Sequence, residues 1–221
     1  MPPEAGSVFG DRRELAERFV GHLVTSGVER GLLGPREAPR IWDRHVLNCA
    51  VVAELVPPDA RVVDVGSGAG LPGIPLALAR PDVDVVLLEP LARRVEWLTE
   101  VIEDLGLAVS VERGRAEDTR VRRRWEGADV VTARAVAPLA RLAGWCVPLL
   151  RPGGVLLAMK GASAADEAAR DRVAVRAAGG AAPRMLRCGS GIVDTPTTVL
   201  VVERIRGTGR PDRARAGRGA R

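Results

Sequence analysis

Short apolar segments alternate with segments of helical periodicity from residue 61 to residue 202, and this alternation limits the fold more than any other feature of the sequence. The predicted strands are residues 61–65, 83–88, 108–112, 128–132, 155–159 and 197–202. The predicted helices lie near residues 73–80, 91–105, 136–149 and 163–178. Strands separated by helices form a mostly parallel sheet that is covered on both faces. The sequence therefore predicts an α/β protein with a Rossmann-like, doubly wound sheet.

The segment before the first predicted strand is different in character. Residues 10–27 and 36–54 carry apolar side chains at helical spacing, which predicts two helices. Pro57 and Pro58 end the second of them before the alternating region begins. The predicted division of the chain is an N-terminal helical cap packed on the core at 1–57, a ligand-binding core at 58–206 and a basic, disordered tail at 207–221.

Positive charge is concentrated at the C-terminus. The chain has a formal net charge of +5, and residues 207–221 hold five arginines against Asp212, which is a net charge of +4. The remainder is therefore nearly neutral, so composition alone does not predict a nucleic-acid partner. The tail could bind phosphates through charge alone, or it could be a solvated segment without a specific partner.

Several classes of protein are disfavoured by what the sequence lacks. It has no run of roughly 18 to 20 apolar residues, as a membrane helix requires, and no N-terminal secretion signal, so we expect a cytoplasmic protein with no membrane partner. Cys49, Cys146 and Cys188 are odd in number and far apart, which predicts buried thiols and neither a disulfide framework nor a metal site. No heptad pattern is present, so we expect a monomer.

A glycine-rich loop follows the first predicted strand. Gly66, Gly68 and Gly70 allow a sharp turn and a close approach of backbone amides to a nucleotide-like ligand. A dinucleotide fingerprint would place its third glycine where this chain has Leu71. Asp64 stands two residues before the loop, where its charge suits a cationic sulfonium, directly or through water, and would repel a pyrophosphate. The loop therefore predicts S-adenosylmethionine as cofactor in preference to a dinucleotide.

Other candidate residues follow the next strands, at the edge where ligands of such sheets bind. Glu89 ends the second predicted strand, where a carboxylate can accept both ribose hydroxyls of an adenosine. The loop 114–118 follows the third and could meet the adenine ring. Arg134 and Lys160, the single lysine of the chain, follow the fourth and fifth, and both are candidates for positioning a substrate. The alternative is that Arg134 is a surface residue at a helix start and Lys160 a surface residue, without such a role.

These residues resemble those of a known family, the bacterial small-subunit (16S) ribosomal RNA guanine-N7 methyltransferases, also called the glucose-inhibited division protein B family. The resemblance covers about residues 10–203. It rests on Arg44 to Asn48, Asp64 to Ala77, Leu87 to Arg94, Arg115-Ala116-Glu117, Arg134-Ala135 and Lys160-Gly161. The run Gly66-Ser67-Gly68-Ala69-Gly70-Leu71-Pro72-Gly73-Ile74-Pro75 is its most specific part.

The resemblance implies a class I methyltransferase whose target is a guanine in the decoding-region loop of 16S ribosomal RNA in the small ribosomal subunit. It implies that the methyl donor is contacted by Gly66, Leu71, Ala116, Glu117 and Arg134, with Glu89 near the ribose. One departure stands out, because Asn48 and Cys49 replace the Asp-Ser pair that is common in the family. A hydrogen bond that needs a carboxylate at residue 48 is therefore not expected here.

Methylation of guanine N7 needs no general base, because N7 carries a lone pair and no proton. Positioning of the nucleophile can supply most of the rate enhancement. N7 lies in the deep groove of an RNA helix, so a target guanine must be in a loop or an open junction. We expect a phosphate-facing rim formed by Arg44, His45, Arg93, Arg134 and Lys160. His45 could instead be a structural residue among apolar neighbours.

Two other functions remain open at this point. One is a methyltransferase that acts on a small molecule or a protein, which would need no ribosomal RNA. The other is a non-catalytic RNA-binding or assembly module that keeps a nucleotide pocket. The intact glycine loop with Asp64 and Glu89 argues against the second.

Overall fold

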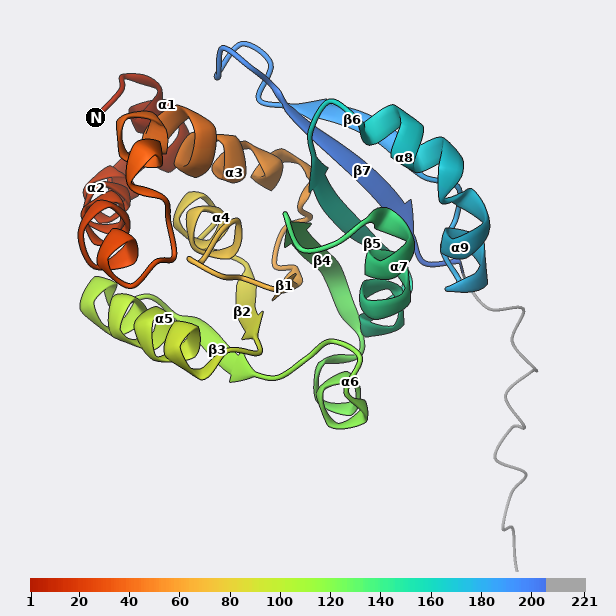
Figure 1. Cartoon of the computed structure of the whole chain (residues 1–221). Coiled ribbons are helices and arrows are strands. Elements are labelled where there is room, and N and C mark those ends of the chain that lie inside the picture. Colours follow the sequence, from red (N-terminus) through yellow and green to blue (C-terminus); the bar gives the residue numbers. More distant parts are fainter. Residues whose placement is uncertain (206–221) are drawn as a thin grey trace, which may run out of the picture.

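The computed structural model describes residues 1–205, and the predicted tail at 207–221 lies outside them. Within this part of the chain one seven-stranded sheet forms the centre of the molecule (Figure 1). Its strands are β1 (Arg61–Val65), β2 (Asp84–Glu89), β3 (Val109–Arg113), β4 (Ala128–Arg134), β5 (Leu150–Lys160), β6 (Arg184–Cys188) and β7 (Thr197–Glu203). Their order across the sheet is β3-β2-β1-β4-β5-β7-β6.

The pairing of the strands creates a crevice at the centre of the sheet. Strands β1 to β5 pair in parallel, whereas β7 runs antiparallel to both β5 and β6. The chain builds outward from β1 to β3 and then returns to place β4 on the other side of β1. Loops that leave the carboxyl ends of β1 and β4 therefore diverge, and such a switch point is where ligands of doubly wound sheets bind.

Helices cover both faces of the sheet. The helices that follow the cap are α4 (Gly73–Ala79), α5 (Ala92–Leu105), α6 (Thr119–Trp125), α7 (Leu139–Cys146) with η6 (Val147–Leu149), α8 (Ala164–Arg170) and α9 (Arg172–Ala177). Alternate strand residues face opposite sides: Val62 joins the hydrophobic cluster that includes α4 and α5, and Val63 joins the one that includes α7. Figure 1 shows these two groups of helices on either side of the sheet. The predicted fold class is confirmed.

The N-terminal segment is a series of short helical pieces. They are α1 (Glu4–Phe9), η1 (Gly10–Arg12), α2 (Arg13–His22), η2 (Leu23–Gly27), η3 (Pro35–Arg40), η4 (Ile41–Leu47), α3 (Asn48–Ala50) and η5 (Val51–Leu55). Sequence periodicity predicted two continuous helices here, at 10–27 and 36–54. Both segments are helical, but they change between α, 3₁₀ and π geometry, and Pro39 lies inside the η3 turn.

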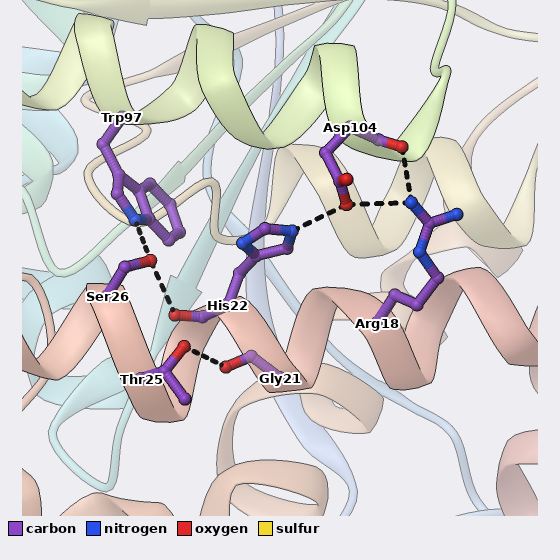
Figure 2. A network of polar contacts seen from close by, with 7 residues as sticks. All are labelled: Arg18, Gly21, His22, Thr25, Ser26, Trp97 and Asp104. Atoms are coloured by element: carbon purple, nitrogen blue, oxygen red, sulfur yellow. Dashed lines mark hydrogen bonds and ion pairs between the residues drawn. The ribbon is translucent and has the colours of Figure 1, made fainter.

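The cap shares its hydrophobic cluster with the sheet. Phe19 of α2 and Trp97 of α5 are fully buried in the cluster that contains Val62 of β1. Polar contacts also join the cap to α5: the indole Nε1 of Trp97 donates to Ser26 Oγ of η2 at 2.9 Å, and His22 Nε2 of α2 lies 2.9 Å from Asp104 Oδ2 (Figure 2). A boundary at residue 57 therefore does not separate two hydrophobic cores.

Three elements of the structure were not predicted. Helices α1 and α6 and strand β6 contain few buried side chains: α6 buries Val121, and β6 buries Cys188. A short element with so little apolar surface leaves only a weak periodic pattern in the sequence. The predicted helix at 163–178 divides at Asp171 into α8 and α9. Within residues 1–205, no helix is long and apolar enough to cross a membrane.

The shared cluster predicts that the cap and the sheet unfold together. Replacement of Phe19 with alanine leaves a cavity in a fully buried site and should lower the free energy of unfolding by about 3–5 kcal/mol. Urea unfolding followed by far-UV circular dichroism and by the fluorescence of the four tryptophans should give one coincident transition, shifted to lower urea. Arg13→Ala, on an exposed position of the same helix, is the control. Separate transitions for the two probes would contradict a shared core.

Candidate active site

The glycine loop after β1 is held close to the segment that follows β4. Gly66 has a φ of +71°, and a Cβ added there would lie 2.7 Å from Cγ2 of Val136. At Gly70, with a φ of +76°, an added Cβ would collide with the Ile74 side chain of α4. Both positions therefore require glycine for conformation and for space. The loop is fixed on one side by the next helix and on the other by residue 136.

Asp64 lies beneath this loop and connects three elements. Its Oδ1 accepts a hydrogen bond from Thr132 Oγ1 of β4 at 2.8 Å, and its Oδ2 accepts one from the Gly73 amide at the start of α4 at 3.1 Å. The side chain is fully buried, and burial raises the pKa of Asp64 to about 6. The structure thus places Asp64 behind the loop, with no surface exposed to a ligand.

Glu89, at the end of β2, orders the opposite side of the loop. Its Oε2 accepts a hydrogen bond from the Gly68 amide at 3.0 Å, and its Oε1 accepts one from the Leu91 amide at 3.0 Å. Arg94 Nη1 lies 3.8 Å from Oε2. Only 2% of the Glu89 side chain is exposed. Each carboxylate oxygen can accept a second hydrogen bond, so this group can still receive ribose hydroxyls at the edge of the loop.

A cavity of about 230 Å³ opens beside Gly66. Its walls are largely apolar, and they come from the ends of β1 and β2, from the loop 114–117 and from α7. They include Val65, Leu88, Ala116, Val136 and Trp145. Glu117 is exposed at the same cavity, whereas Ala116 is buried.

S-adenosylmethionine suits these surroundings, because apolar walls fit a purine ring and carboxylates fit ribose hydroxyls and a cationic sulfonium. The fit rests on the apolar cavity beside Gly66 and on two carboxylates. Glu89 lies at the end of β2, and Glu117 lies in the loop after β3.

A larger cavity of about 530 Å³ lies at the carboxyl ends of β4 and β5, next to β7. Four cationic side chains line it, namely Arg44, Arg134, Lys160 and Arg187, together with polar residues such as Asn48 and Thr198. None of its lining residues carries a carboxylate. An array of cations with no acid among them is suited to an anionic ligand such as a phosphate-bearing nucleotide.

Residues 134–136 form the partition between the two cavities. Arg134 and Ala135 line the larger one, and Val136 lines the smaller one. The turn is sharp, since Ala135 has a φ of +54°. A ligand in the smaller cavity and a ligand in the larger one would therefore meet across this short segment.

A family model described as rRNA small subunit methyltransferase G matches residues 12–193. The chain belongs to this family. A relative from Salinispora arenicola (strain CNS-205), named ribosomal RNA small subunit methyltransferase G, is 56% identical over 235 residues, which cover 100% of this chain and 96% of the relative. The resemblance seen in the sequence is thereby confirmed, and with it the predicted class of enzyme, a methyltransferase.

Solved structures of low identity share the fold. The S-adenosylmethionine-dependent methyltransferase SibL, in its apo form, has a TM-score of 0.60 at 18% identity and covers 87% of this chain and 70% of that chain. The [4+2]-cyclase SpnF has a TM-score of 0.58 at 13% identity and covers 89% of this chain and 96% of that chain. Because one of these two is a cyclase, the comparison supports the class I methyltransferase fold and carries no reaction by itself.

In this member of the rRNA small subunit methyltransferase G family, the predicted rim residues have different positions. Arg44 is exposed, and Arg134 and Lys160 line the larger cavity beside it. Arg93 is exposed on α5 and is absent from the lining of that cavity. His45 is only 8% exposed and lies behind the wall, so the description of it as a rim residue does not match its position.

Lys160 is paired from within the protein. Its Nζ donates to Glu167 Oε1 and to the Ala137 carbonyl, each at 2.9 Å, and its side chain is 12% exposed. Glu167 also accepts a hydrogen bond from the Leu139 amide at 2.6 Å, at the start of α7. The ammonium group therefore fixes the wall of the cavity at the same time as it lines it.

Sequence reasoning missed Arg187 and Glu37. Arg187 lies on the unpredicted edge strand β6, in a run with little apolar character. Glu37, in the η3 turn, accepts from His45. Leu71, which was predicted to contact the methyl donor, is buried in the hydrophobic cluster below the loop. The described residues include no group of three or more His, Cys, Asp or Glu side chains placed to hold a metal ion.

The burial of Asp64 predicts a pH-dependent contribution to stability. Its folded pKa of about 6 lies above the unfolded value of about 3.9, so the folded state holds this proton more tightly. The stability that this provides is present below about pH 4 and is lost as pH rises through about 6. Asp64→Asn should therefore gain stability relative to the native protein, by up to about 3 kcal/mol, between pH 4 and pH 7.

Urea unfolding at pH 4 and at pH 7 measures the difference in stability between Asp64→Asn and the native protein. The control is Asp84→Asn, which changes an exposed carboxylate at the start of β2 and should show no such shift. A constant difference between the Asp64 variant and the native protein would mean that Asp64 ionises normally in the fold.

Proposed function

We propose that this chain transfers the methyl group of S-adenosylmethionine to N7 of a guanine in the decoding-region loop of small-subunit (16S) ribosomal RNA. Family membership supports a methyltransferase of small-subunit ribosomal RNA, as its relatives are named. The observation that carries the proposal further is the larger cavity, which is lined by four cations and no carboxylate and meets the smaller cavity at residues 134–136.

The chemistry of that cavity favours a nucleophile without a proton. Its lining residues include arginines, a lysine paired with Glu167, threonines and Asn48, and none of these is a base at neutral pH. Guanine N7 needs no base, whereas a hydroxyl nucleophile would need one. Methylation at N7 therefore agrees with the residues that line the cavity. The family resemblance supports N7 independently of these residues.

The residues of this chain would act by binding and orientation. The glycine loop (Gly66, Gly68 and Gly70), Glu89, Ala116 and Glu117 would hold the adenosine, with Leu71 and Asp64 supporting the loop from behind. Bound S-adenosylmethionine supplies the electrophilic methyl group. Arg134, at the partition, would align donor and nucleotide, while Arg44, Lys160 and Arg187 would hold RNA phosphates. Arg93 could extend this contact along α5.

Methyl transfer from labelled S-adenosylmethionine tests the proposal directly. The acceptors are small-subunit particles and naked ribosomal RNA from a strain that lacks this protein, followed by mapping of 7-methylguanine. We expect one modified guanine in the decoding-region loop. Label in a protein or small-molecule fraction would favour the alternative acceptor, and donor binding without any transfer would favour a non-catalytic module.

Glu89 provides a test of the donor site alone. Glu89→Gln removes the charge that holds the Gly68 and Leu91 amides and replaces one acceptor oxygen with a donor. We expect the affinity for S-adenosylmethionine, measured by calorimetry, to fall about tenfold or more. Glu96→Gln, at an exposed position of α5, should bind normally. Equal affinities in the two variants would remove Glu89 from the proposed donor site.

Arg44 and Arg187 provide a test of the RNA side. Each side chain is exposed at the larger cavity, so alanine at either position should weaken RNA binding and reduce the log–log slope of affinity against salt by about 0.7–0.9 per phosphate contact. Arg176→Ala, exposed on α9, is the control for general charge loss. If all three variants lose affinity equally, the cavity is not the RNA site.

A further inference from the structure

His45 has two polar neighbours on different elements. Its Nδ1 lies 2.6 Å from Arg134 Nη2, at the end of β4, and its Nε2 lies 2.8 Å from Glu37 Oε2, in the η3 turn. The His45 side chain is 10% exposed. Arg44, next to His45 in the chain, pairs with the other oxygen of Glu37 at 3.6 Å. A buried ring thus joins an acid of the cap to the arginine at the partition between the two cavities.

The chemistry of the two neighbours determines which ring nitrogen carries the proton. A guanidinium group only donates hydrogen bonds, so Nδ1 must present its lone pair to Arg134. A carboxylate only accepts, so Nε2 must carry the hydrogen that is donated to Glu37. His45 is therefore neutral and protonated at Nε2. A second proton at Nδ1 would point an N–H group at a cation.

The charged groups around His45 act in opposite directions on its pKa. Burial, the largest effect, lowers the pKa of His45 below its ordinary value, and the positive charges of Arg134 and Arg44 lower it further. The hydrogen bond with Glu37 raises it, and the same bond lowers the pKa of Glu37. The neutral ring that the geometry requires is therefore also the form that its surroundings favour at neutral pH.

The second amino group of Arg134 is held as well. Its Nη1 donates to the buried Cys49 Sγ at 2.8 Å. Burial raises the pKa of Cys49 to about 11, so the sulfur is a neutral thiol and a weak acceptor. His45 is thus the stronger of the two acceptors that orient the guanidinium.

We propose that His45 is a positioning residue. Glu37 orients His45, and His45 holds Arg134 in place at the partition between the smaller and the larger cavity. This inference rests on the proposed function, because it gives Arg134 its task there. Without His45 the guanidinium loses its short hydrogen bond to a ring nitrogen and can turn away from the partition. Activity should then fall although no residue that contacts substrate has been replaced.

The protonation state can be observed directly, because the chain contains two histidines, His22 and His45. Long-range ¹H–¹⁵N NMR of ¹⁵N-histidine protein distinguishes protonated from unprotonated ring nitrogens. We expect one ring, assigned to His45 by its loss in His45→Asn, to be protonated at Nε2 alone at neutral pH, because burial lowers the pKa of His45 below its ordinary value. His22, which is paired with Asp104 of α5, is the internal comparison (Figure 2). A His45 ring that carries its proton on Nδ1, or on both nitrogens at neutral pH, would overturn the proposal.

Kinetics test the consequence for Arg134. The set is His45→Asn, His45→Gln, Glu37→Gln and Arg134→Ala, with His22→Asn as the matched control. We expect kcat/KM to fall about tenfold in the His45 variants, as for a lost hydrogen bond to a charged group, and by less in Glu37→Gln. The native enzyme should lose activity as pH falls through the His45 pKa, because the added proton expels Arg134, and the His45 variants should lack this acid limb.

Each outcome has a distinct meaning. His45 variants with native kcat/KM and a native acid limb would overturn the positioning role, even if Arg134→Ala is inactive. Folded His45 variants, verified by thermal unfolding, whose loss is additive with that of Arg134→Ala would also overturn it. If the native protein does not methylate RNA, the proposed function fails, and the donor affinity of the same variants together with the NMR spectrum still decides whether His45 holds Arg134.

Discussion

The buried carboxylate of Asp64 is the contact on which the site geometry depends. It accepts hydrogen bonds from β4 and from the first residue of α4 while it belongs to β1, so three elements that diverge at the crevice are tied at one point. The glycine loop between β1 and α4 can then take only the sharp path in which Gly66 touches Val136. The sequence predicted that this carboxylate would face a cationic ligand. In the structure it is fully buried and acts through the loop that it supports.

The sequence predicted those parts of the fold whose residues are buried in regular patterns. Six strands and the glycine loop were recognised because short apolar runs and closely spaced glycines leave local signals. Strand β6 and helix α6 were missed because their burial is slight, and with β6 went Arg187. The contacts of His45 and Lys160 could not be predicted, since their partners Glu37, Arg134 and Glu167 are brought near only by tertiary packing.

Charge in this protein is informative by position and not by amount. Arginine is abundant in the sequence, and within residues 1–205 many arginines are paired with carboxylates, such as Arg80 with Asp82 and Arg151 with Asp129. The larger cavity differs because four cations and no acid line it, although two of the four, Lys160 and Arg44, pair with Glu167 and Glu37 outside the lining. A fold shared with a cyclase does not indicate a substrate. The cations that line the larger cavity indicate an anionic substrate more directly than the sheet does.

The two cations at the back of that cavity are oriented in the same way, by acceptors buried behind them. Lys160 is held by Glu167 and the Ala137 carbonyl, and Arg134 is held by His45 and Cys49. A side chain fixed before the ligand arrives loses less conformational entropy on binding, so these two positions can align a nucleotide more sharply than exposed Arg44 or Arg187. The exposed pair would supply attraction to phosphate, and the half-buried pair, Arg134 and Lys160, would supply orientation. When a nucleophile needs no base, protein side chains contribute to the rate mainly by orienting it toward the methyl group.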